Sequence, residues 1–410
     1  LIALDILSPT EKGERFYDES FIDKLCQVVC NSAKEIKEDL SILLDKICQN
    51  KWVKHNAPYN ALSLYILTRS QYVQNLIISV PDKVIELAKL YWISDENDDE
   101  EDMYGYRSAM DVESKFGLRD LNFINNYSPA GADQTPIYTL LCVSPQKTIN
   151  FIIELMNYCI EYYCTSTKTL NDITEIDVHH NGTITKQFGS YYLWGIYRGA
   201  IHITIPCLLQ SIHMALEKYL LELDKVNSEF VKTIMDYILS KSKTVSLTAV
   251  VASIVMSNPE RYWRYALDLF RTKELFDYDS IRCMDESQHS WFIGMDALMN
   301  KNIAQERNDS AALEFRKEKL ENICVRYQYF RTNNLSEEDS TYIVKEIHNI
   351  IDKHYEYAKS LEGNERSLYE ILMYRMDRRT HKPQVSEQNG HTCIELCPHL
   401  PVLLKKYIDE

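Results

Sequence analysis

Glycine and proline are scarce in this chain, which has only 11 of each among its 410 residues. Both residues mark turns, so their scarcity argues against the many short strands of a large all-β protein and favours long helices. Hydrophobic residues make up 45% of the chain and charged residues 26%, which allows a packed core and excludes a disordered protein. The chain also has no run of eighteen apolar residues, so we expect no membrane-spanning helix.

Short catalytic motifs are missing as well. The sequence contains no GxxxxGKS/T phosphate loop and no GxGxxG, HExxH, GxSxG or CxxC pattern. Without a phosphate loop we expect this chain neither to bind nor to hydrolyse ATP. We therefore predict that it is not itself an enzyme and that it holds no cofactor.

The charge balance is acidic, with a formal net charge of -15 at pH 7. We therefore expect a protein ligand as the partner of this chain, and we do not expect nucleic acid. Basic residues gather at Arg261–Lys273 and at Arg375–Arg379, but acidic neighbours interrupt both groups. The odd count of 11 cysteines, many at apolar helical positions, favours free thiols in the reducing cytoplasm.

Apolar residues recur at helical spacing along most of the chain. In the clearest case, the nearly uncharged run Thr244–Met256 is followed by Asn258–Pro259 and then by an amphipathic segment. A buried helix, a turn and a half-buried helix form the unit of a helical stack. The pattern predicts an all-α protein, an irregular helical-repeat (solenoid-like) array with one inserted β-hairpin.

Four consecutive segments are predicted. They are a helical segment at 1–93, an acidic and loop-rich connector at 94–134, a helical segment with the hairpin at 135–240 and a helical-repeat segment at 241–410. A helix is expected from Pro145 to about Tyr163. Later helices are expected at Pro206–Asp224, Glu229–Ser240, Ser246–Ser257, Glu260–Arg271, Ala311–Phe330, Glu337–Lys359 and Glu365–Asp377. Ser336 and Asp339 resemble a capping box at the start of one of them.

The hairpin is predicted at residues 175–186, where two alternating segments flank Asn181–Gly182. Its first strand contains the adjacent histidines His179 and His180. Adjacent strand residues point to opposite faces, so these two cannot bind one metal ion together. We expect both to be exposed.

Two acidic segments invite a metal interpretation. Asp95–Asp102 is acidic at seven of eight positions, but Glu100 stands where a calcium loop needs glycine, so a solvated loop is expected. Glu113–Lys115, with Asp102 or Asp111, imitates the acidic pair and lysine of a metal-dependent nuclease. That chemistry needs the glutamate and lysine on a strand.

Four soft ligands gather near the end of the sequence, at His391, Cys393, Cys397 and His399. They match the ligand types that zinc prefers, but their spacing does not match that of known zinc knuckles. A strand or loop is the simpler prediction, and zinc binding stays open.

Several stretches of the chain resemble one protein family. They are Pro129–Pro136, Phe151–Tyr158, Leu193–Gly199, Leu208–Leu220, Leu247–Ser253, Phe270–Phe276 and Arg375–Asp377. Over about residues 129–379 the chain resembles the helical C-terminal region of bacterial antiviral STAND NTPases (Avs-type) and related large ATP-binding proteins. These are packing motifs, so the resemblance carries over no catalytic residue.

The resemblance implies a protein with an N-terminal effector, a central P-loop NTPase and a C-terminal helical-repeat sensor that binds a viral protein and drives oligomerisation. This chain has neither effector nor phosphate loop, and it begins at Leu1, so we expect it to be a piece of a larger protein. It would be the cytoplasmic sensor or scaffold region, with a phage protein as ligand and with self-association. Two alternatives stay open, namely a metal-dependent nuclease-like effector domain and a structural scaffold of a larger assembly.

Aromatic anchors are expected to carry ligand binding, because Tyr and Trp contribute heavily to interface energies. The candidate protein-binding residues are Tyr191, Tyr192, Trp194 and Tyr197, which follow the predicted hairpin. The alternative, that these rings belong to the core, is slightly favoured, because aromatic clusters at helical spacing usually do.

Overall fold

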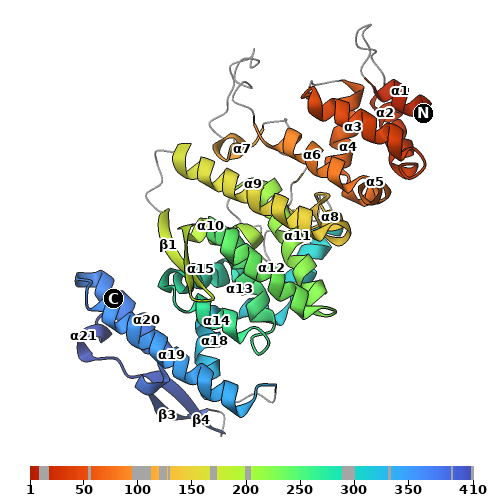
Figure 1. Cartoon of the computed structure of the whole chain (residues 1–410). Coiled ribbons are helices and arrows are strands. Elements are labelled where there is room, and N and C mark those ends of the chain that lie inside the picture. Colours follow the sequence, from red (N-terminus) through yellow and green to blue (C-terminus); the bar gives the residue numbers. More distant parts are fainter. Residues whose placement is uncertain are drawn as a thin grey trace. The chain divides into compact units, whose positions relative to one another are not determined.

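The computed structural model describes residues 1–8, 18–53, 57–94, 112–119, 127, 130–166, 173–198, 205–288, 301–330, 334–388 and 391–407 (Figure 1). These residues are mostly helical, with 20 α-helices and two small β-hairpins. The predicted helical class is thereby confirmed, while the solenoid-like arrangement stays a prediction. In the described part of the chain, no helix combines the length and the apolar character needed to cross a membrane.

The chain folds into two compact units whose segments interleave along the sequence. Unit 1 contains Leu1–Glu175, Gln187–Val251 and Asp285–Ala312, and unit 2 contains Ile176–Lys186, Ala252–Met284 and Leu313–Glu410. The sequence pattern predicts four consecutive segments instead, because periodicity does not show which distant segments pack together.

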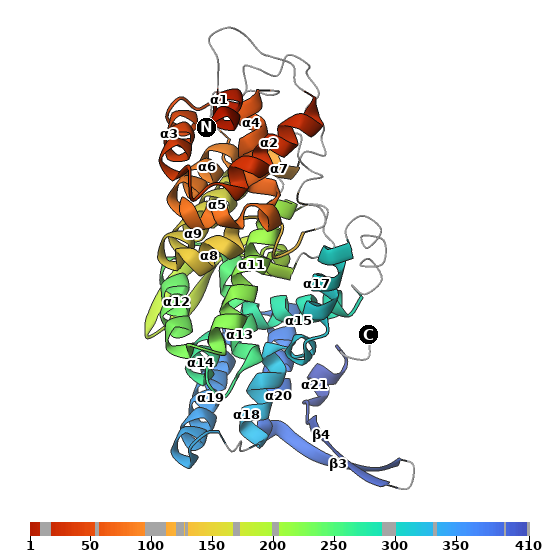
Figure 2. The ribbon, with the colours of Figure 1, turned by 90° about the vertical axis from the view of Figure 1, so that its right-hand side faces the viewer.

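Unit 1 is built almost entirely of helices. Its first half contains α1 (Ile2–Leu7), α2 (Glu19–Asn31), α3 (Lys37–Gln49), α4 (Pro58–Thr68), η1 (Ser70–Tyr72), α5 (Gln74–Ser79), α6 (Pro81–Trp92) and α7 (Val112–Lys115). Its remaining elements are α8 (Ile137–Val143), α9 (Pro145–Ser166), α10 (Tyr191–Gly195), η3 (Ile196–Arg198), α11 (Cys207–Asp224), α12 (Ser228–Lys241), the first half of α13 (Val245–Ser257) and α17 (Lys301–Ala311). Helices α8 and α11 pack side by side in both views (Figures 1 and 2).

Helix α13 is buried along its length, as its near-absence of charge predicts. All residues from Thr244 to Met256 are buried. The polar groups among them have internal partners: the Thr248 hydroxyl donates to Gln187 Oε1 at 2.7 Å, and Ser246 Oγ lies 3.0 Å from His213 Nε2. Paired in this way, buried hydroxyls do not incur the desolvation penalty of an unmade hydrogen bond.

Unit 2 combines helices with the two hairpins. It contains most of β1 (Thr174–His180) and β2 (Thr183–Gly189), the second half of α13, α14 (Trp263–Leu269) and most of α15 (Lys273–Gln288). It continues with η5 (Glu314–Lys317), α18 (Leu320–Tyr329), α19 (Glu337–Ala358), α20 (Gly363–Met376), η6 (Arg378–Thr380), β3 (His381–Gln388), β4 (His391–Pro398) and α21 (Val402–Lys405).

The predicted hairpin is confirmed, together with its turn. Asn181 and Gly182 have φ angles of 47° and 75°. A two-residue turn with both angles positive matches the right-handed twist of the flanking strands, which is why Asn-Gly predicts it.

A second hairpin corrects the prediction of a single one. Strands β3 and β4 pair antiparallel from His381↔Pro398 to Gln388↔His391. In this register Pro383, Val385 and Leu396 share one face, and Val385 and Leu396 are 68% and 47% exposed. The sequence concealed the pair because Pro383 is unusual within a strand and polar residues dominate the connection.

Candidate protein-interaction surface

Five partly exposed tyrosines lie on two helices of unit 1, and they are called the tyrosine cluster below. Helix α9 contributes Tyr158, Tyr162 and Tyr163, and α10 contributes Tyr191 and Tyr192. Tyr158 and Tyr162 are 36% and 39% exposed, and the other three are half-buried. Large rings held partly in solvent on a helical base are typical of protein-binding surfaces.

Rings within the cluster pack against one another. Tyr158 and Tyr162 lie one helical turn apart, with ring centroids separated by 6.1 Å. The centroids of Tyr191 and Tyr192 are 3.9 Å apart. Burial raises the pKa of Tyr163, and Cys164 and Tyr192 raise it further.

A short segment after α7 fixes one side of the cluster. Gly117 has a φ of +66°, and a Cβ atom there would lie 2.9 Å from Cγ of Tyr162 and 3.0 Å from the Tyr158 hydroxyl oxygen. The adjacent Phe116 stacks on Tyr163 at 4.2 Å. The Gly117 carbonyl accepts a hydrogen bond from the Ser94 amide at 3.0 Å, which ties this segment to the end of α6. Only glycine allows so close an approach.

The N-terminal cap of α10 fixes the turn that carries Tyr191 and Tyr192. The Ser190 hydroxyl accepts a hydrogen bond from the Leu193 amide at 3.2 Å and thereby fixes the first turn. Within that turn Tyr191 and Tyr192 stay half-buried, while Leu193 is 1% exposed.

The structure separates the four predicted binding residues into two pairs. Trp194 and Tyr197 are 0% and 1% exposed, so both side chains pack in the core, where one face of this single-turn helix and the η3 turn fill unit 1. A binding role for these two residues stays a prediction. A role for Tyr191 and Tyr192 in binding stays a prediction.

Sequence reasoning missed Tyr158 and Tyr162. A signal for them exists, since their spacing of four places both on one face of α9. Leu155, Met156 and Cys159 on the same helix are buried. The two tyrosines alternate with them and therefore face outward.

Polar contacts border the cluster on α9. Lys243 Nζ forms an ion pair with Glu161 at 2.8 Å, and the Lys243 amide donates to Asn157 Oδ1 at 2.8 Å. The Asn157 side-chain amide in turn donates to the Lys241 carbonyl at 3.0 Å. These bonds hold the segment before α13 against α9, so the surface beside the tyrosines is rigid and polar.

The described residues do not provide the arrangement that a nuclease site or a calcium site would need. Glu113–Lys115 lie on α7, a four-residue helix, and not on the strand that a nuclease site requires. Asp95–Asp102 and Asp111 lie outside the described residues. Among the residues that are described, no group of three His, Cys, Asp or Glu side chains is placed to hold a metal ion.

The four candidate zinc ligands follow an extended backbone. His391, Cys393 and Cys397 lie on β4, and His399 comes one residue after it. At about 3.3 Å per residue, eight steps along a strand separate the two histidines by roughly 26 Å. Zinc binds its ligands at about 2.0–2.3 Å, and so extended a backbone holds the two ends of this segment far apart.

The paired histidines of the first hairpin differ in environment. Strand β1 alternates as predicted, with Ile176, Val178 and His180 buried on one face. His180 is 5% exposed, and its Nδ1 lies 3.5 Å from Asp268 Oδ2, so the expectation that both histidines are exposed is wrong. Tyr265 on α14 stacks on the His180 ring at 5.8 Å and covers that face.

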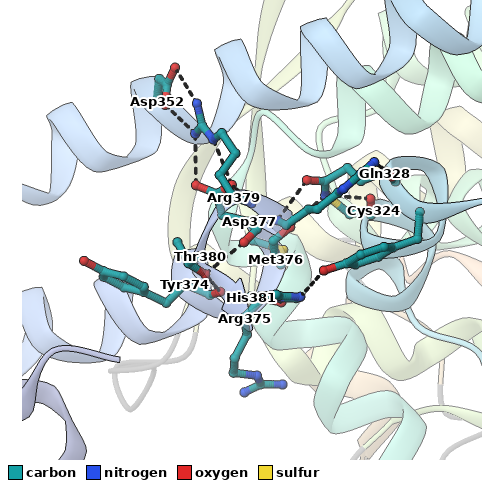
Figure 3. A network of polar contacts seen from close by, with 12 residues as sticks. Cys324, Gln328, Asp352, Tyr374, Arg375, Met376, Asp377, Arg379, Thr380 and His381 are labelled. Carbon is teal, nitrogen blue, oxygen red and sulfur yellow. Dashed lines mark hydrogen bonds and ion pairs between the residues drawn. The ribbon is translucent and has the colours of Figure 1, made fainter. Parts of the chain in front are cut away.

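The basic group near the end of α20 is engaged in internal contacts (Figure 3). Arg375 Nη2 donates to Glu321 at 2.5 Å, and the Arg378 guanidinium donates to the Gln328 carbonyl. Arg379 binds the buried Asp377 at 2.9 Å and Asp352 at 2.6 Å. The acidic residues that were expected to interrupt this basic group thus form specific ion pairs with its arginines.

Comparison with models of known protein families gives no match, and comparison with curated proteins gives none.

Proposed function

We propose that this chain is the helical-repeat sensor or scaffold region of a cytoplasmic anti-phage defence STAND NTPase. In this role it binds a viral protein and couples that binding to oligomerisation of the larger protein. The observation that carries the proposal is the tyrosine cluster, in which Tyr158, Tyr162, Tyr191 and Tyr192 keep part of each ring in solvent on a helical base. The family resemblance of the sequence supplies the biological setting.

The physical case rests on the low entropic cost of ordering these rings. A tyrosine already packed against its neighbours loses little further freedom when a ligand covers it, and it then contributes both apolar area and a hydroxyl group. The chain's net charge of -15 favours a ligand with a basic or mixed surface. Surrounding charges would then set the association rate, while the rings hold the complex together.

The test compares three variants during phage infection. Two paired variants, Tyr191→Ala with Tyr192→Ala and Tyr158→Ala with Tyr162→Ala, each remove one half of the cluster. Tyr72→Ala on η1 is the matched control, because Tyr72 is 49% exposed and lies outside the cluster. Each is built into the full-length protein, and both phage protection and capture of one identified viral protein are measured.

We expect the paired variants to stay folded, with a cooperative melt at a modestly lower temperature, and to lose at least about tenfold in ligand affinity, since an interface tyrosine at a hot spot contributes about 2 kcal/mol or more. Tyr72→Ala should retain both binding and protection. Unchanged protection in both paired variants would remove this surface from consideration. Assembly that proceeds equally with and without infection would instead support the structural-scaffold alternative.

A further inference from the structure

Helix α17 makes polar contacts with one loop of unit 1. The Glu306 carboxylate accepts from the Ala132 amide at 3.1 Å, and Arg307 Nη1 donates to the Ala130 carbonyl at 2.7 Å. The same loop is anchored from the other side, because its Gly131 amide donates to Ser211 Oγ on α11 at 3.2 Å. The loop thus links α17 to the core helix α11.

Gly131 sets how closely α17 approaches. Its φ lies outside the left-handed region, so the backbone itself tolerates a side chain. A Cβ at this position would nonetheless lie 2.8 Å from Ile303 Cγ2 and 3.0 Å from Glu306 Oε2. Glycine is required here for space, and any larger residue pushes directly against α17.

The rest of α17 is poorly suited to permanent burial. Only Ile303, Ala304 and Arg307 are buried in its eleven residues. Isolated helices shorter than about 12–15 residues are marginal in water, so α17 depends on this docking contact to stay ordered. The docking contact consists of two apolar side chains, Ile303 and Ala304, and two charged ones, Glu306 and Arg307. A single substitution can therefore change its free energy by a large fraction.

We propose that α17 is a releasable strap, which docks on the loop Ala130–Asp133 through Glu306 and Arg307 and detaches without unfolding the rest of unit 1. The strap does not depend on the identity of any ligand. Its segment, Asp285–Ala312, continues in the chain into unit 2 at both ends.

The experiment measures hydrogen exchange of the intact chain by mass spectrometry. Glu306→Ala removes the carboxylate that accepts from the loop. Asp309→Ala is the control, because it also removes a carboxylate from α17, at an exposed position where that carboxylate accepts a hydrogen bond from Gln305 of the same helix. Gly131→Ala forces the strap away while leaving the sequence of α17 untouched.

We expect Glu306→Ala and Gly131→Ala each to speed exchange of peptides within 301–311 by about tenfold or more, in keeping with a hydrogen bond to a charged group. Peptides of α11 and α13 should exchange as in the parent, and so should the strap in Asp309→Ala. Equal acceleration in α11 would show that α17 is an inseparable part of unit 1 and would overturn the proposal. Unchanged exchange of 301–311 in both loop-contact variants would overturn it too.

Discussion

The Asp279 carboxylate and the Arg282 guanidinium form an ion pair of 3.0 Å within α15, where their side chains are 0% and 2% exposed. Each also serves the backbone of a neighbouring segment. Asp279 accepts from the Leu320 amide at 2.8 Å, and Arg282 donates to the carbonyls of Arg316 and Glu318 at 2.8 and 2.6 Å. One turn of α15 thereby supplies hydrogen-bond partners for backbone groups between η5 and α18, where the helical hydrogen bonds are interrupted.

Removing one member of this pair should destabilise unit 2. Asp279→Ala leaves the Arg282 guanidinium buried with its principal counter-charge gone, and we expect a loss of about 3–5 kcal/mol in the free energy of unfolding. Asp277→Ala, on the same helix, breaks only the exposed pair with Lys273 and should cost less than about 1 kcal/mol. Urea denaturation followed by circular dichroism measures both, and equal losses would contradict the assignment.

A charge inside α13 should be far more damaging than the same charge on the surface. Val251 is 0% exposed, so Val251→Asp buries a carboxylate without a partner and should lower stability by several kcal/mol. The control is Val226→Asp, because Val226 is 82% exposed. Thermal melts compare the two. A Val251→Asp protein that melts like the parent would mean that α13 is solvated in solution.

The separation of the candidate binding residues into core and surface can be tested by stability alone. Trp194→Ala empties a fully buried site and should cost about 3–5 kcal/mol. Tyr191→Ala removes a half-buried ring and should cost distinctly less, about 1 kcal/mol. Chemical denaturation of the two single variants decides the point, and the reverse order would return Tyr191 to the core.

Acid should weaken the fold through His213. Burial lowers the pKa of this histidine to about 4 from an ordinary value of 6.5. The folded state keeps the ring neutral, so its stabilising contribution is complete above pH 6.5 and is lost as the pH falls toward 4. The loss is on the order of 3 kcal/mol. His213→Gln should flatten this part of the stability–pH curve, as urea denaturation at a series of pH values would measure.

The strap should respond to pH in the opposite direction. Burial raises the pKa of Glu306, with Asp133 raising it further and Lys218 and Arg307 opposing the shift. The docked helix therefore holds a proton more readily than the free one, so docking strengthens as the pH falls through the raised pKa and weakens above it. Protection factors of 301–311, corrected for intrinsic exchange, should rise on acidification. Glu306→Gln should abolish that rise.

Helix positions were largely predictable because apolar periodicity and caps act locally. Helix α11 begins within one residue of its predicted start, and α19 begins at Glu337 as expected. The Ser336 cap is also confirmed: the Asp339 amide donates to Ser336 Oγ at 3.0 Å, and that hydroxyl donates to Asp339 at 2.7 Å. A cap and its partner lie three residues apart, so the sequence contains the whole interaction.

Interactions between distant residues were not predictable in this way. The expected helix Ala311–Phe330 is broken before Leu320, since Asp279 and Arg282 take over its backbone groups from α15. The strap contact joins Ala132 to Glu306 across 174 positions, and no local pattern announces it. For the tyrosine cluster, periodicity could place Tyr158 and Tyr162 on an outer face, but not beside the rings of α10.

The second hairpin gives the chain a vulnerable backbone edge. Within the described part of the chain this sheet has two strands, so each strand offers one row of amide and carbonyl groups that no other described strand occupies. On β3, Pro383 lacks an amide hydrogen and Lys382 adds charge, and both features discourage an incoming strand. Strand β4 contains no proline before Pro398. Fibril growth at high protein concentration should therefore begin by templating along β4, and a single interior proline there should suppress it.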